Sequence, residues 1–166
     1  MKTIWLMQKE AFGDLLEKYR DHGISPVSES YERIIEKYEM EGSFYYFISD
    51  SGVNVGVIRI IDKNDGSRKR ISPIWIMSEH RNKGYAQAAI IEAERIHGSD
   101  NWSLDTILQE KGNLHLYEKL GYHRTGKIEK INDRMDIVYY PESVKLSKVQ
   151  SGALAPKKHQ PRRCFC

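Results

Sequence analysis

Cysteine is missing from almost the whole chain, because the two cysteines, Cys164 and Cys166, both lie among the last three of 166 residues. They cannot build an internal disulfide framework, so the composition favours a reducing compartment. No apolar run approaches the roughly 20 residues that a membrane span needs, and the first ten residues show no signal-peptide pattern. These absences exclude a disulfide-stapled domain and predict a cytoplasmic protein with no membrane partner.

A basic excess is also missing from most of the chain, although the net charge is +3. Residues 151–166 hold four Lys and Arg side chains and no acid, so residues 1–150 carry a net charge of −1. A nearly neutral body argues against nucleic acid as a partner of the folded part. We expect one domain over residues 1–146, followed by a polar basic tail over residues 147–166 that is either disordered or a cloning remnant.

The familiar glycine-rich nucleotide loops are absent as well. The chain contains neither Gly-x-Gly-x-x-Gly nor Gly-x-x-x-x-Gly-Lys-Ser/Thr, which excludes a dinucleotide fingerprint and a P-loop. His115 and His123 have no neighbouring cysteines or carboxylates at the spacing of a metal site, so no metal is expected.

Hydrophobic periodicity predicts the elements that are present. Helical spacing of apolar residues occurs over residues 8–20, 28–40, 85–97 and 113–120. Strand-like runs occur over residues 2–7, 43–49, 53–61, 71–77, 102–108, 122–131 and 135–140. Pro73 lacks an N–H donor and therefore predicts a bulge or a local splay in its strand. The order predicts an α+β fold, in which helices flank a mixed, mostly antiparallel central sheet.

The segment 74–89 has the features of a phosphate-binding site. A strand leads into a polar, basic loop, and a helix begins near Gly84. Helix starts leave N–H groups unpaired and concentrate positive potential, so they attract phosphate. Gly84 allows close approach, Ala86 keeps the next turn small, and Arg81 and Lys83 add positive charge. The alternative is a glycine-flanked turn with a solvated basic edge.

Two motifs in this region resemble a known family. Residues 74–86 read IWIMSEHRNKGYA, which is similar to a strand followed by Arg/Gln-x-x-Gly-x-Gly/Ala. Residues 116–122 read LYEKLGY, which is similar to Leu-Tyr-x-x-x-Gly-Phe/Tyr. Both motifs, in this order, are those of the GNAT family of N-acetyltransferases, and the resemblance covers roughly residues 1–145. It implies the GNAT-like acyl-CoA N-acyltransferase fold, with acetyl-CoA as co-substrate.

The resemblance also implies positions for the co-substrate. The backbone of Ile74, Trp75 and Ile76 would run beside the pantetheine arm, and the amide of Ile76 would meet the reaction's oxyanion. The pyrophosphate would be wrapped by the backbone amides of Asn82, Lys83, Gly84, Tyr85, Ala86 and Gln87. Asn113 would bond to the cofactor arm, although the family more often has its asparagine where this chain has Glu110.

Direct acetyl transfer needs a base for the amine and an acid for the thiolate, and it needs no covalent nucleophile. By resemblance, Tyr117 is the proton donor; alternatively it is a tyrosine that packs on Leu120. Asp105, on the strand over residues 102–108, is the candidate base; alternatively it accepts bonds from backbone or from a surface lysine. Glu110 is the reserve candidate for the base.

In the family, the acceptor cleft is built from the first two helices and the last hairpin. These segments offer an acidic, aromatic rim made of Glu29, Glu32, Glu36, Glu39, Tyr31, Tyr38, Tyr45, Tyr139 and Tyr140. Such a rim suits a cationic amine. Alternatively, the glutamates are the solvent-exposed face of an amphipathic helix.

The sequence therefore predicts an N-acetyltransferase that acts on a primary amine of a small molecule or a peptide through a ternary complex, as a monomer or homodimer. One alternative is a non-catalytic CoA-sensing module on the same fold. Another is an adaptor that acts through residues 157–163.

Overall fold

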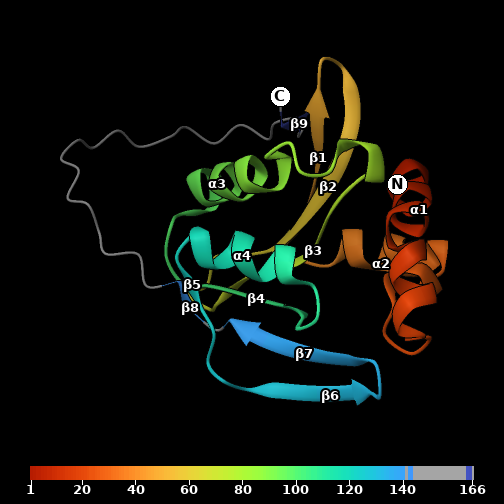
Figure 1. Ribbon diagram of the computed structural model, residues 1–166. Helices are drawn as coiled ribbons and strands as arrows, with labels where there is room; N and C mark the ends of the chain where they lie inside the picture. The colour runs from red at the N-terminus through yellow and green to blue at the C-terminus, as the bar shows by residue number, and fades with distance from the viewer. Residues whose placement is uncertain (141, 144–163, 166) are drawn as a thin grey trace, which may run out of the picture.

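The computed structural model describes residues 1–140, 142–143 and 164–165 (Figure 1). The helices are α1 (Lys2–Tyr19), α2 (Tyr31–Glu39), α3 (Tyr85–His97) and α4 (Lys111–Lys119), with short 3-10 helices η1 (Pro26–Ser28) and η2 (Ser78–His80). The strands are β1 (Ser43–Asp50), β2 (Val53–Ile61), β3 (Lys69–Ile76), β4 (Trp102–Ile107), β5 (Tyr122–His123), β6 (Ile128–Asn132), β7 (Met135–Tyr140), β8 (Glu142–Ser143) and β9 (Cys164–Phe165). No helix in this part of the chain is long and apolar enough to span a membrane.

The main sheet has the order β6-β7-β4-β3-β2-β1-β9. Four of its neighbouring pairs are antiparallel, while β3 with β4 and β1 with β9 are parallel. This arrangement confirms the predicted α+β class with a mixed, mostly antiparallel sheet. The short strands β5 and β8 form a second, two-stranded sheet.

Helices cover both faces of the main sheet, because each strand presents apolar side chains alternately to either side. Tyr45 packs with α1 and α2, whereas the next residue, Tyr46, packs with α3 and α4. In the same way, Val57 packs on the side of α1 and α2, and Ile58 packs on the side of α3 and α4. The two larger apolar clusters therefore lie on opposite sides of the sheet, and a third, smaller cluster joins Tyr19 of α1 to Met135 and Ile137 of β7.

The strand predicted over residues 2–7 is wrong, because these residues form the first turns of α1. The buried face of α1 consists of Ile4, Gln8, Ala11 and Tyr19, which recur at helical spacing. Gln8 is buried despite its amide, since Nε2 donates to the Pro26 carbonyl at 2.8 Å. Because Gln8 is polar and Ala11 is small, the buried face of α1 does not show up as a helical pattern of large apolar residues.

The strand predicted over residues 122–131 is interrupted. β5 ends at His123 and β6 begins at Ile128, with Gly126 between them at φ 80°. β5 pairs with β8 in the second sheet, so it does not continue into the hairpin β6–β7 of the main sheet. The predicted boundary at residue 146 and most of the 147–166 tail lie outside the described residues; within that tail, Cys164 and Phe165 pair with β1.

The divergence of β3 from β4 creates the main opening in the sheet. Within the described residues, these strands pair only at Lys69–Trp102 and Arg70–Ser103. The bulge predicted at Pro73 is present, because β3 has two residues, Ser72 and Pro73, between Ile71 and Ile74, where β2 has one, Arg59, between their partners. The buried Arg59 guanidinium donates to the Ser72 carbonyl at this bulge, at 3.1 Å. Beyond Arg70, β3 therefore has an open edge, and a wedge separates it from β4.

Replacing Gly56 with alanine tests how tightly β3 is held on its other side. A Cβ at Gly56 would lie 2.4 Å from the Trp75 carbonyl oxygen, and neither backbone can move alone. Overpacking of this kind costs about 1–3 kcal/mol, so we expect G56A to lower the free energy of unfolding in urea by that amount. Gly13 is the control, because a Cβ there would meet no atom within 4 Å apart from its chain neighbours and the backbone of its own helix. Equal stability of G56A and the wild type would show that β2 and β3 are not fixed in this register.

Candidate functional site

Two cavities, of about 470 and 390 Å³, open along the wedge between β3 and β4. The larger reaches the β6–β7 hairpin and is here the hairpin cavity; the smaller reaches the loop before α3 and is the loop cavity. The two cavities share five of their lining residues, which are Phe12, Leu15, Ile74, Asn113 and Tyr117. The two cavities therefore meet at a shared wall made by α1, β3 and α4.

The loop cavity is built around the start of α3. Gly84 is the N-cap of this helix and makes no side-chain cap, so the N–H groups of the first turn, residues 85–87, are not capped by a side chain. Tyr85, Ala86 and Gln87 line the cavity. Unpaired N–H groups and the positive end of a helix dipole together favour a bound phosphate.

The backbone of this loop turns twice into the left-handed region. Asn82 has φ 61° and Gly84 has φ 85°, conformations that glycine and asparagine adopt most readily. Apart from its two chain neighbours, no residue has an atom within 4 Å of a Cβ placed on Gly84. Glycine is therefore needed here for the left-handed backbone conformation, since a side chain would meet no crowding. The space beside Gly84 belongs to the loop cavity.

The two basic side chains of the loop behave differently. Arg81 lines the loop cavity and donates to the carbonyl of Ile76 at 3.2 Å and to that of Ala11 at 2.9 Å. It therefore ties the loop to α1 and β3, while its positive charge stays beside the cavity. Among the described residues, Lys83 is not part of the cavity lining.

The three predicted β3 residues, Ile74, Trp75 and Ile76, also line the loop cavity. Trp75 packs its ring against Phe12 of α1, with centroids 5.8 Å apart. Because β3 faces the wedge rather than β4 here, its backbone groups on that side are available to a ligand.

Tyr117 lies in the shared wall between the cavities. It belongs to α4, is 5% exposed, and packs edge-on against Tyr122 and Tyr140. Burial raises the pKa of Tyr117 well above its usual range, and the negative charge of Asp105 adds to this effect. The phenol therefore keeps its proton at physiological pH.

Asp105 lines the hairpin cavity and forms an ion pair with Arg70 of β3. The predicted alternation of β4 is confirmed, since Trp102, Leu104 and Thr106 are buried on one face. The side chain of Asp105 is 28% exposed. The structure thus places Asp105 and Tyr117 in the lining of the hairpin cavity, where Arg70 is the ion-pair partner of Asp105.

Asn113 and Glu110 both lie at the start of α4. Asn113 lines both cavities and donates to the Thr106 hydroxyl at 3.1 Å. Glu110 accepts from Lys18 Nζ at 2.7 Å and from the Tyr19 hydroxyl at 2.5 Å. Burial raises the pKa of Glu110, but the bonds from Lys18 and Tyr19 outweigh burial and lower it overall. The reserve candidate for the base is therefore an engaged, ionised carboxylate.

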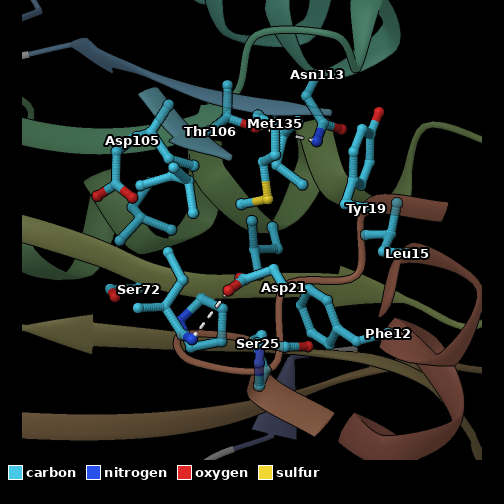
Figure 2. Close-up of a pocket in the computed structure, with 18 of the residues that line it drawn as sticks. Phe12, Leu15, Tyr19, Asp21, Ser25, Ser72, Asp105, Thr106, Asn113 and Met135 are labelled. Atoms are coloured by element: carbon cyan, nitrogen blue, oxygen red, sulfur yellow. Dashed lines mark hydrogen bonds between the residues drawn. The ribbon is translucent and has the colours of Figure 1, made fainter. Parts of the chain in front are cut away.

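Figure 2 shows the hairpin cavity, where side chains from α1, β3, β4 and β7 converge. Of the rim predicted from tyrosines and glutamates, Glu29 and Tyr139 line this cavity. The lining also includes residues that the sequence reasoning missed, notably Asp21, Arg70 and Phe12. Only the pairing of β3 with β4 brings Arg70 beside Asp105, so no local signal identifies it. Within the described parts of the chain, no group of His, Cys, Asp and Glu could hold a metal ion.

Comparisons with known proteins agree with this geometry. The model of the Acetyltransferase (GNAT) family matches residues 10–122. No curated protein matches the chain. A chimera of the Vibrio cholerae spermidine N-acetyltransferase SpeG and hSSAT has a similar fold, with a TM-score of 0.57, 21% identity, and coverage of 79% of this chain and 91% of that one.

Two further solved structures share the fold and contain acetyl-CoA. A putative streptothricin acetyltransferase from Bacillus anthracis str. Ames has a TM-score of 0.53 at 18% identity, with 64% of this chain and 65% of that chain covered. A GNAT family acetyltransferase from Elizabethkingia anophelis has a TM-score of 0.52 at 17% identity, with 67% and 81% covered. The family match, the fold and the uncapped start of α3 agree: the chain belongs to the GNAT family and is an acetyl-CoA-dependent N-acetyltransferase.

Proposed function

We propose that this protein transfers the acetyl group of acetyl-CoA directly to a primary amine of a small molecule, with both substrates bound at once. The observation that carries the proposal is the position of Tyr117, a buried proton donor in the wall shared by two cavities. One cavity suits a phosphate-bearing cofactor, and the other suits an amine. Acetyl transfer across the shared wall needs no covalent intermediate on the protein.

The loop cavity would hold acetyl-CoA. The first-turn amides of α3, from Tyr85 to Gln87, would bind the pyrophosphate, and Arg81 would add positive charge. The open edge of β3 at Ile74–Ile76 would bind the amide groups of the pantetheine arm. When bound, acetyl-CoA supplies the acyl thioester.

Two side chains carry out the proton transfers, one in the hairpin cavity and one in the shared wall. Asp105 accepts a proton from the incoming ammonium, directly or through one water, and so frees the nitrogen lone pair. The Ile76 amide stabilises the negative oxygen while the N–C bond forms. Tyr117 donates its proton to the sulfur as the C–S bond breaks, and the second proton of the attacking nitrogen then passes to the Tyr117 phenolate, directly or through water. The products are a neutral amide and a thiol, Tyr117 is protonated again, and Asp105 releases the first proton to solvent.

A small amine fits the hairpin cavity better than a peptide does. The cavity measures about 470 Å³ and is lined by α1 and the β6–β7 hairpin, dimensions typical of a site for a small ligand. The spermidine N-acetyltransferases with a similar fold support the same class of acceptor. Whether the protein acts as a monomer or a homodimer stays a prediction from the sequence.

The proton donor is tested by Tyr117→Phe. Phenylalanine keeps the aromatic packing of α4 but removes the hydroxyl, so kcat should fall by about 100-fold or more. Affinity for CoA, measured by calorimetry, should stay near the wild-type value. Thiol release from acetyl-CoA with a panel of small amines gives the rates. Unchanged kcat in Y117F would remove Tyr117 as the acid, and CoA binding without turnover of any amine by the wild type would favour a CoA-sensing module.

The base is tested by Asp105→Asn. The amide keeps the shape of the side chain and cannot take up the amine proton, so we expect kcat/KM for the amine to fall by about 100-fold at neutral pH. Part of this loss should be recovered at higher pH, where more of the amine is already neutral. Asp133→Asn, at an exposed turn, is the control for loss of one negative charge. Wild-type activity in D105N would assign the proton transfer to another group.

A further inference from the structure

Asp21 is a buried carboxylate that faces the hairpin cavity. It lies two residues after the end of α1, beyond the C-cap Arg20, and it is 7% exposed. Its Oδ1 accepts the backbone N–H of Ile24 at 3.1 Å, which fixes the side chain in place. Figure 2 shows the Asp21 carboxylate among the side chains that line the cavity.

No cation in the described part of the chain forms an ion pair with Asp21. The two basic side chains that line the hairpin cavity both have other partners, because Lys37 pairs with Glu29 and Arg70 pairs with Asp105. A carboxylate with little exposed surface and no cation beside it favours a cationic partner. The protein keeps one here, held by a single backbone bond and open to a cavity.

The charges of the cavity lining point to the same kind of ligand. The lining includes two basic residues, Lys37 and Arg70, and four acidic ones, which are Asp21, Glu29, Asp105 and Glu129. Once the two ion pairs are formed, Asp21 and Glu129 remain, and Glu129 lies on an exposed part of β6 where it accepts from the Tyr139 hydroxyl. Asp21 is therefore the buried negative charge that a cationic ligand would neutralise.

The position of Asp21 separates it from the chemistry at Tyr117. Asp21 lines the hairpin cavity but not the loop cavity, whereas Tyr117 lines both. Much of the remaining lining of the hairpin cavity is apolar, and it includes Phe12, Leu15, Met135 and Ile137. Such a cavity offers an anchor for a positive charge, an apolar surface for a carbon chain, and a reactive end.

We infer that Asp21 binds a second cationic group of the acceptor, so that the preferred substrates are diamines joined by an alkyl chain. This inference rests on the proposed function, since it assigns the acceptor to the hairpin cavity. One ammonium pairs with Asp21 while the other amine reaches Asp105 and Tyr117. Asp21 is thus a specificity-determining residue and takes no part in proton transfer.

The test compares straight-chain diamines with alkyl monoamines of equal length, from propyl to octyl. For the wild type, kcat/KM should favour the diamine at a chain length that spans the cavity, by more than the statistical advantage of two amines. Asp21→Asn keeps the shape and the acceptor for Ile24, and it removes the charge. Loss of a charge-assisted hydrogen bond should lower the diamine-to-monoamine ratio by about 10- to 100-fold.

Asp14→Asn is the matched control, because Asp14 is an exposed carboxylate of α1 outside both cavities. Its diamine-to-monoamine ratio should equal that of the wild type. Turnover of both amine classes with the same ratio in the wild type and D21N would overturn the role of Asp21 and leave the proposed function intact. If no amine is acetylated, the proposed function fails, and calorimetry still decides: diamine binding to the CoA complex should weaken in D21N, and equal binding would refute the inference.

Discussion

The parting of β3 from β4 is the constraint on which the rest of the structure depends. The two strands pair at Lys69–Trp102 and Arg70–Ser103, and the bulge at Ser72–Pro73 follows at once on β3. A buried Arg59 bonds to the Ser72 carbonyl and holds the bulge from the side of β2. If the strands stayed paired, neither cavity would exist, and α4 would have no opening to cover. The strand edge, the start of α3 and the ring of Tyr117 face common space because the sheet opens there.

The opening also separates two electrostatic environments. On the loop side, Arg81 and the uncapped start of α3 provide positive potential. On the hairpin side, acidic residues outnumber basic ones in the lining. A polyanionic co-substrate and a cationic acceptor would therefore each favour a different cavity and approach each other at the shared wall. This separation gives each substrate its own side before any chemistry occurs.

The sequence indicates most of the residues that line the loop cavity, although not the exclusion of Lys83, because the determinants of this cavity are local. A strand, two left-handed residues and a helix start follow one another within residues 74–87, so their chemistry is readable from the order of residues. The hairpin cavity is different. Arg70 meets Asp105 across 35 positions of the chain, and Asp21 resembles any polar residue after a helix until α1 folds against the wedge. The incorrect strand at residues 2–7 has a related cause, since the buried face of α1 includes Gln8, whose amide is bonded to the distant Pro26 carbonyl and Glu29 carboxylate.

Initial-velocity kinetics test the central claim, that both substrates occupy adjoining cavities at the same time. Acetyl-CoA and an amine would be varied against each other, and the rates displayed as double-reciprocal plots. Direct transfer in a ternary complex predicts lines that intersect. Parallel lines, together with an acetylated protein isolated in the absence of amine, would contradict the account, because they indicate a covalent acetyl-protein intermediate in place of direct transfer.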